Sequence, residues 1–462
     1  MSYKTVLLLV FIFAINSVFA GQPAGWVNYP LVNDITLPNG LRVMLIENNE
    51  QPAVCFRVLV KTGKIDNVAG KYGLAELAAQ MMQEGTKSRT SDQIAEQIAV
   101  IGADLDISSQ AECTIFKFNV LSQFAETGFD ILADIMLNPS FPLQEFKRVQ
   151  KEFMTAADLE LTDNYRIASD YGRFLLFGAD NPLGHANTRK SLKAISLKDM
   201  QGFYQKNYHP GNCILLVIGD FSQEQMLERI KEKFGLWKSA SAEQKLQTRP
   251  DFDKKGKIIV VDKPAMTQAI IYLNQWAPDS RSSDYYEFLT ANYVLGGSDF
   301  SSRLMNAVRA KGGKTYYIGS RCDINLDYGV FSIMTSTRNQ ELFDTYQLIQ
   351  TELKKFINDG IDANELIAAK SYTTGAIPMQ LESADAIANK ILNSLMKGFT
   401  VDDLSHEVIN YNNVSLDSLD SVIREYIKPQ NMNVVIVGDI RKIKEQLTKI
   451  GNYEKVYYKN LP

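Results

Sequence analysis

An internal repeat is the feature of this sequence that most constrains its fold. Residues 196–221 (SLKDMQGFYQKNYHPGNCILLVIGDF) align without gaps onto residues 415–440 (SLDSLDSVIREYIKPQNMNVVIVGDI), at the constant offset of 219 residues that separates the two first serines. Pro210 matches Pro429, and each copy closes its strand on Gly-Asp. Both copies have the pattern of an amphipathic helix, a stop marked by proline, and a strand of bulky aliphatic residues.

The repeat predicts two homologous α+β domains, 21–237 and 258–462. A weaker similarity pairs residues 141–152 with the segment that begins at Ile361. Residues 238–257 (KSASAEQKLQTRPDFDKKGK) are polar, which is typical of an exposed linker. Each half begins with strands and continues with helices, and the first contains the turn sequence Pro-Asn-Gly at 38–40. Strands interleaved with helices predict a layered domain with helices packed on one face of a sheet.

The N-terminus has the pattern of a cleavable signal peptide spanning residues 1–20. A single lysine precedes an unbroken apolar run at 6–15, and Val18 and Ala20 occupy the positions expected before a signal-peptidase cut. Ten apolar residues are too few to cross a bilayer, which takes about 20. We therefore expect cleavage after Ala20 and an exported protein, periplasmic or secreted, with no membrane span; an uncleaved N-terminal anchor is the alternative.

Composition excludes several classes of protein. A net charge of -4, spread along the chain, leaves no basic footprint for nucleic acid. Four cysteines in 462 residues cannot form a disulfide scaffold. Cys55, Cys113 and Cys213 lie in apolar runs typical of strands, so buried thiols are expected there. An oxidising compartment would also allow these residues and Cys322 to pair, and the sequence leaves that open.

The two-domain plan, the LPNG turn at 37–40 and the VIGD strand end at 217–220 together resemble the pitrilysin/insulinase metallopeptidases, the inverzincins. The resemblance covers nearly all of the chain after the signal peptide. It implies two homologous α+β domains, each a mainly antiparallel sheet covered by helices. The two domains would form half of a clam-shell chamber.

In active members of that family a helix carries H-x-x-E-H, followed shortly by Gly-Thr. The two histidines bind zinc and the glutamate polarises the attacking water. The corresponding segment here is 73–86 (GLAELAAQMMQEGT), which places Glu76 and Gln80 at the histidine positions and Ala79 at the base position. The chain therefore resembles the non-catalytic subunits of the family, with the helix kept and the zinc motif degenerate.

The resemblance places the third zinc ligand near Ala156 or Ala157, with Asp158 and Glu160 within a register error. Glu76, Gln80 and one further carboxylate would suit calcium or magnesium, weakly, better than zinc. The chain's histidines, His185, His209 and His406, show no metal-ligand spacing. We expect no metal and no cofactor in this chain, with zinc held only by a partner subunit.

The second half contains residues 294–320 (VLGGSDFSSRLMNAVRAKGGKTYYIGS). Gly296 and Gly297 open a loop, after which Ser298 or Asp299 is expected to cap an amphipathic helix over 300–310. Two glycines at 312–313 end that helix, and a strand is predicted to begin at Thr315.

This segment resembles the family's second functional motif, an arginine and a tyrosine seven residues apart. Arg309 and Tyr316 match that spacing, and the resemblance implies that they, with Gly296 and Gly297, contact a substrate peptide bound at the zinc site of another domain. Otherwise, an arginine in a last helical turn complements the helix dipole, and a tyrosine at a strand start is ordinary packing. Tyr317 is predicted to face the other side of the strand.

These observations predict a zinc-free, substrate-binding subunit of an exported heteromeric peptidase of the pitrilysin type. A homologous partner would supply H-x-x-E-H, this chain would supply Arg309 and Tyr316, and the substrates would be unstructured peptides. Alone, the chain is expected to be inactive. The alternative is a non-proteolytic peptide-binding or assembly protein of the same fold. A self-sufficient enzyme ranks last, because no Ser-His or Cys-His arrangement is present.

Overall fold

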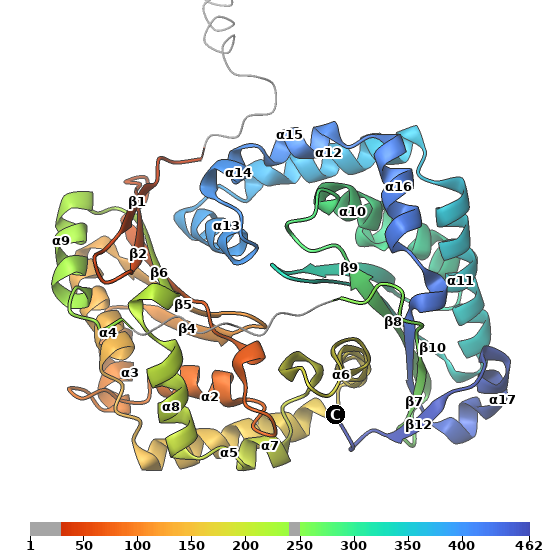
Figure 1. Ribbon diagram of the computed structural model, residues 1–462, viewed down its shortest axis with the longest axis horizontal. Helices are drawn as coiled ribbons and strands as arrows, with labels where there is room; N and C mark the ends of the chain where they lie inside the picture. The colour runs from red at the N-terminus through yellow and green to blue at the C-terminus, as the bar shows by residue number, and fades with distance from the viewer. Residues whose placement is uncertain (1–28, 240–249) are drawn as a thin grey trace, which may run out of the picture.

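Two six-stranded sheets face each other across the molecule in the computed structural model, which describes residues 29–239 and 250–462 (Figure 1). The predicted signal peptide lies outside the described residues, as does the middle of the predicted linker, and the boundaries 21–237 and 258–462 stay a prediction. Among the described helices, none is long and apolar enough to cross a bilayer.

Each half of the chain builds one sheet. In spatial order, the strands of the first sheet are β1 (Asn33–Thr36), β2 (Arg42–Glu47), β6 (Cys213–Gly219), β3 (Ala53–Val60), β5 (Thr114–Leu121) and β4 (Asp104–Ser109). Those of the second are β12 (Glu454–Tyr457), β7 (Ile258–Asp262), β11 (Asn433–Gly438), β8 (Gln268–Ala277), β10 (Gly329–Arg338) and β9 (Ile318–Ile324).

Five strands of each sheet share a topology, β2-β6-β3-β5-β4 and β7-β11-β8-β10-β9, which confirms the predicted α+β fold with two homologous units. The edge strands differ, because β1 pairs antiparallel with β2 whereas β12 comes from the end of the chain. In both sheets, the strand that closes the repeat pairs parallel with one neighbour and antiparallel with the other: β6 with β2 and β3, and β11 with β7 and β8. The sheets are mixed, because β12 also pairs parallel with β7. The predicted turn between β1 and β2 is present, with Gly40 at a φ of 93°.

The repeat corresponds to one helix and one strand in each half. Helix α8 spans Leu197–Asn207 and α16 spans Leu416–Tyr426, bounds that differ by the same offset as the sequences. Ser196 caps α8 by accepting a hydrogen bond from the backbone of Asp199, and Ser415 caps α16 in the same way. The weaker similarity also has a structural counterpart, because α5 (Leu143–Glu160) and α12 (Ala363–Met379) occupy equivalent places in the sequence of elements.

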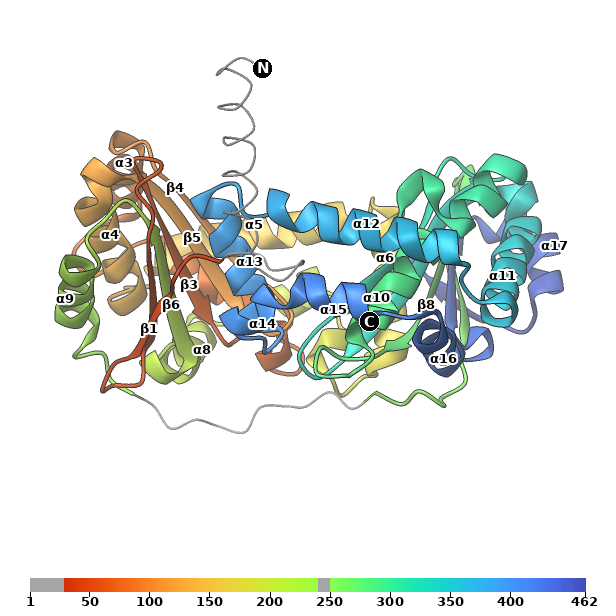
Figure 2. The same ribbon diagram turned by 90° about the horizontal axis from the view of Figure 1, so that it is seen from above.

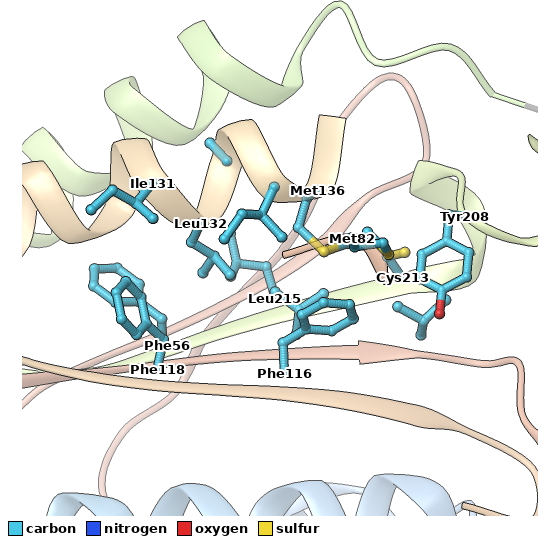
Figure 3. Packing of buried hydrophobic residues seen from close by; sticks show 14 of the residues in the cluster. Phe56, Met82, Phe116, Phe118, Ile131, Leu132, Met136, Tyr208, Cys213 and Leu215 are labelled. Atoms are coloured by element: carbon cyan, nitrogen blue, oxygen red, sulfur yellow. The ribbon is translucent and has the colours of Figure 1, made fainter. Parts of the chain in front are cut away.

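The remaining helices flank the sheets. Those of the first half are α2 (Leu74–Met81), α3 (Ser91–Val100), α4 (Ala125–Leu137), α6 (Asn164–Phe177), α7 (Arg189–Lys193) and α9 (Gln223–Phe234). Those of the second half are α10 (Tyr285–Asn292), α11 (Leu342–Asp359), α13 (Ala384–Met396), α14 (Val401–Ser405), α15 (Glu407–Asn413) and α17 (Ile440–Ile450). Figure 3 shows the first core, in which Phe56, Phe116 and Phe118 of the sheet pack toward Leu132 of α4.

One helix from each half covers the sheet of the other half. Helix α13 packs on β3 and β6, where Ile387 and Ile391 join the apolar residues of the first sheet. Helix α6 packs on β8 and β11, where Ile167 and Tyr171 contact the second sheet. Figure 1 shows both helices between the two sheets. The expectation of helices on one face is therefore wrong, because these exchanged helices bury the second apolar face of each sheet.

Polar contacts fix both exchanged helices. Arg57, fully buried in β3, forms an ion pair with Asp385 in the first turn of α13 and also donates to Asn119. On the other side, the hydroxyl of Tyr171 donates to the carbonyl oxygen of Asn460 at 2.7 Å. A buried charge left without its partner is costly, so the Arg57–Asp385 pair favours one register for α13.

Gly172 allows α6 to lie close to the second sheet. A β-carbon at this position would overlap the ring of Tyr272 and lie 2.8 Å from Nδ2 of Asn274. We predict that Gly172→Ala lowers the free energy of unfolding by about 1–3 kcal/mol, because the new methyl group displaces the helix. Urea unfolding followed by circular dichroism measures this change.

The matched control is Gly202→Ala, on the exposed face of α8, where a β-carbon meets no atom within 4 Å. This substitution should raise the free energy of unfolding by about 0.5–1 kcal/mol, because alanine favours a helix over glycine. If both changes shifted stability in the same direction, close packing at Gly172 would not be the reason for its glycine.

Candidate functional site

Helix α2 keeps an apolar face while its zinc-motif positions carry other residues. Leu74, Leu77, Ala78 and Met81 are buried in the first core. Ala79, at the position of the catalytic base, is only 2% exposed and carries no group that can accept a proton. The helix therefore persists because it packs, and its packing does not depend on a metal.

The carboxylate of Glu76 is bound by one neutral side chain and one positively charged side chain. Its Oε1 accepts a hydrogen bond from Nδ2 of Asn187 at 2.8 Å and lies 3.3 Å from Nζ of Lys64. Its Oε2 is buried and accepts no hydrogen bond from the described residues. Lys64 and Asn187 also line a cavity of about 380 Å³ between the two halves, which Arg321 of β9 lines from the opposite side. The degenerate zinc-motif position Glu76 therefore lies next to this cavity.

Gln80 belongs to a separate polar group. Its Nε2 approaches Oε1 of Glu84 at 3.4 Å, and Glu84 is buried, paired with Arg148 and hydrogen-bonded by Ser91 Oγ at 2.9 Å. With Arg148 and Ser91 already bound to it, this carboxylate acts as a structural anion between α2, α3 and α5.

The predicted third-ligand region lies on α5. Ala157 is buried in the same apolar cluster as α2, whereas Ala156 is exposed. Asp158 pairs with Arg189, whose Nε lies 2.8 Å from Oδ2, and Glu160 lies 3.4 Å from Nη2 of Arg166. Both carboxylates are therefore bound to arginines of later elements.

These residues do not fit zinc. The motif positions offer one carboxylate, which Lys64 already neutralises, and one amide. Structural and catalytic zinc sites use histidine or cysteine with or without a carboxylate, and no histidine occupies either motif position. His185 instead stacks on Tyr72, with ring centroids 4.0 Å apart. Within residues 29–239 and 250–462, no three His, Cys, Asp or Glu side chains are grouped to bind a metal ion.

The segment with the second motif differs from its predicted structure in its helix, in the cap of that helix and in the start of its strand. The helix is a π-helical stretch, Met305–Lys311, and Ser302 accepts a hydrogen bond from the Met305 backbone in place of the predicted cap at Ser298 or Asp299. Asp299 has a φ of 45°, which a helix cap does not adopt. The strand β9 begins at Ile318, three residues after the predicted start.

Arg309 and Tyr316 lie on either side of the glycine turn at 312–313. Tyr316 is 85% exposed, and the guanidinium of Arg309 stacks over the exposed ring of Phe300, 4.8 Å from its centroid. Tyr317 is 54% exposed, and its hydroxyl lies 3.4 Å from Oδ1 of Asp299. The predicted alternation of the two tyrosines across a strand is wrong, because both precede β9.

The two predicted glycines have different surroundings. Gly296 is buried, and a β-carbon there would lie 2.5 Å from the backbone nitrogen of Ser320 in β9. Gly297 is exposed and is the last residue of a π-helical turn, Tyr293–Gly297. Gly296 therefore brings this loop close to the strand that follows Tyr316.

The structure gathers the predicted residues into two groups on different halves, and it adds contacts that sequence reasoning missed. Asn187, which binds Glu76, carries no sequence signal because it lies 111 residues away along the chain, whereas Lys64 lies in the turn shortly before α2. Phe300, 70% exposed in the turn Asp299–Ser301, also carries no sequence signal, since the sequence places it within an amphipathic helix.

Two family models match the chain. The model of the insulinase family (peptidase family M16) matches residues 42–167, and the model of the peptidase M16 inactive domain matches residues 194–372. Among curated proteins, the uncharacterized zinc protease YmxG of Bacillus subtilis is 24% identical over 407 residues, covering 86% of this chain and 95% of that protein. The non-peptidase homolog YmxG of Helicobacter pylori is 22% identical over 432 residues, covering 92% of this chain and 98% of that protein.

Two solved structures have the same fold. A peptidase M16 inactive domain from Pseudomonas fluorescens superimposes with a TM-score of 0.82 at 22% identity, covering 88% of this chain and 98% of that one. A protease from Helicobacter pylori superimposes with a TM-score of 0.81 at 20% identity, covering 89% of this chain and 100% of that one.

The donor set predicts that the purified chain holds no stoichiometric zinc. Elemental analysis after dialysis against a mild chelator should find zinc far below one ion per chain. Near-stoichiometric zinc that resists the chelator would contradict the conclusion that the site does not fit this metal.

Restoring the motif should not restore an enzyme. The triple variant Glu76→His, Ala79→Glu and Gln80→His is expected to bind zinc weakly and to cleave peptides poorly, because no free carboxylate supplies the third ligand. Isothermal titration with zinc and a fluorogenic peptide assay measure both properties. Strong peptidase activity would show that Asp158 or Glu160 leaves its arginine to bind the metal.

Proposed function

This chain belongs to the insulinase (M16) peptidase family and lacks the family's zinc motif, and from that premise we propose that it is the zinc-free, substrate-binding subunit of a heteromeric peptidase. A homologous partner carrying H-x-x-E-H holds the zinc and activates the water. This chain supplies Arg309 and Tyr316 to the bound peptide. Alone, it leaves peptides uncut.

The observation that carries the proposal is the contrast between the two halves. At the zinc position, Lys64 and Asn187 bind Glu76, and Ala79 has no proton-accepting group. In the second half, Tyr316 presents its side chain to solvent although nothing in the fold requires an exposed aromatic ring there. The name of the Helicobacter pylori relative, a non-peptidase homolog, supports inactivity of the chain alone.

The chemistry of the pair suits a peptide bond under attack. The phenol hydroxyl of Tyr316 and the guanidinium of Arg309 are donors for a carbonyl oxygen, and they bind more strongly when that oxygen becomes an oxyanion. A preorganised donor of this kind lowers the barrier by roughly 3–4 kcal/mol. The exposed position of Tyr316 leaves its hydroxyl accessible to a group brought by another molecule.

The partner and the compartment follow from the same proposal. A chamber closed by two bilobed subunits excludes bulk water and folded proteins, so its substrates are unstructured peptides. The N-terminal signal pattern directs the chain to the periplasm or the outside of the cell. Zinc is the only cofactor of the complex, and it lies in the partner.

The test is steady-state kinetics on the assembled complex with Tyr316→Phe. The change removes one hydroxyl and keeps the ring, so assembly should persist. Loss of about 3 kcal/mol of oxyanion stabilisation lowers kcat by roughly two orders of magnitude and changes KM less. Arg309→Ala should affect both constants, because a charged donor also binds the ground-state peptide.

Tyr317→Phe is the control within the same loop, because the Tyr317 hydroxyl faces Asp299 of its own chain. Its kcat should stay within a factor of about two, which separates a specific hydroxyl effect from disturbance of the loop. Full activity in Tyr316→Phe, with the complex intact by size-exclusion chromatography, would favour the alternative of a non-proteolytic binding or assembly protein.

A further inference from the structure

Helix α12 presents an exposed face without charge. Its charged residues are Glu365 and Lys370, and both are engaged within the fold: Glu365 pairs with Arg303, and Lys370 Nζ donates to the carbonyl oxygen of Asn412. The exposed residues from Ile367 to the end of the helix are Ile367, Ala368, Ser371, Tyr372, Gly375, Pro378 and Met379. At 100° per residue they occupy one continuous arc of the helix.

The equivalent helix of the first half shows that the fold does not require such a face. Helix α5 carries the charged residues Glu145, Lys147, Arg148, Lys151, Glu152, Asp158 and Glu160. Figure 1 shows α5 and α12 at opposite sides of the molecule. Three large apolar side chains, Ile367, Tyr372 and Met379, are exposed on the uncharged face of α12, and such a grouping is typical of a binding surface.

This face continues into the loop of Arg309 and Tyr316. Tyr372 is 62% exposed and stacks on Tyr293, with ring centroids 4.9 Å apart. Burial raises the pKa of Tyr293, with the neighbouring Tyr372 and Asp299 adding to the effect. Asp299 in turn accepts a hydrogen bond from the hydroxyl of Tyr317. The next residue, Phe300, is 70% exposed, and the guanidinium of Arg309 lies over its ring.

We propose that the exposed face of α12 together with Tyr293 and Phe300, here called the aromatic wall, binds the large apolar side chains of an extended peptide whose backbone reaches Tyr316. The inference rests on the proposed function for the identity of the occupant, because a peptide that contacts Tyr316 passes next to this surface. Helix α12 contacts α10 and the turn Tyr293–Gly297 that directly follows α10. Figure 2 shows α12 and α10 in the same half of the molecule.

The chemistry sets the substrate class. Aromatic rings and an uncharged helix face stabilise leucine, phenylalanine and similar side chains, and they penalise a carboxylate or ammonium group placed against them. Peptides rich in large apolar residues should therefore bind, and peptides in which serine and glutamate replace those residues should not.

Fluorescence anisotropy on the full chain alone, without its partner, tests the proposal. The probes are an unstructured fluorescein-labelled peptide with regularly spaced leucine and phenylalanine and its serine and glutamate counterpart. Tyr372→Ala and Met379→Lys are each expected to weaken binding of the apolar peptide by about tenfold or more, because the first removes an aromatic anchor and the second places an ammonium group against apolar side chains. Tyr372→Phe keeps the ring and should bind as the unmodified chain does.

The matched control is Leu159→Ala, an equally exposed apolar residue on the equivalent helix α5, which should leave binding unchanged. Absence of binding by the unmodified chain, or binding that none of the α12 variants weakens, would overturn the proposal. A change in sedimentation with unchanged peptide binding would also overturn it, by assigning the face to contact between protein chains. Because the partner is absent, these outcomes are independent of the Tyr316→Phe kinetics.

Discussion

The reciprocal exchange of α6 and α13 is the contact on which the rest of this structure depends. Each sheet has two apolar faces, and the helices of its own half cover only one of them. Ile391 of α13 and Tyr171 of α6 seal the remaining faces, and buried Arg57 anchors the first of these contacts through Asp385. Neither half can bury its sheet alone, so the two halves are fixed relative to each other by hydrophobic burial.

That rigid relation has a consequence for function. Helix α2 belongs to the first half, and the loop of Arg309 and Tyr316 belongs to the second. The packing of α6 and α13 on the opposite sheets joins the two halves. The zinc-motif positions carry a structural polar contact in which Lys64 and Asn187 bind Glu76. The second half keeps an exposed tyrosine beside an uncharged helix face, the kind of surface that packing alone does not maintain.

Much of this arrangement follows from the sequence, because local chemistry determines it. The offset between the repeats predicts α8 with β6 and α16 with β11, and serine caps begin both helices. The exchange of α6 and α13 has no local signal, since a helix that covers a distant sheet has the same periodicity as one that covers its own. The start of β9 was misplaced because β-branched and aromatic residues at 315–317 favour a strand, whereas the Thr315 side chain instead bonds within a turn to the carbonyl oxygen of Tyr317.

We have proposed that this chain acts within a two-chain peptidase. Purification of the tagged full-length chain from its native source, followed by mass spectrometry and a peptidase assay, is the most direct test of that proposal. We predict equimolar recovery of a homologous protein that carries H-x-x-E-H, with chelator-sensitive peptide hydrolysis in the same fraction. Recovery of this chain alone or only with copies of itself, and without peptide hydrolysis, would rule out the two-chain peptidase.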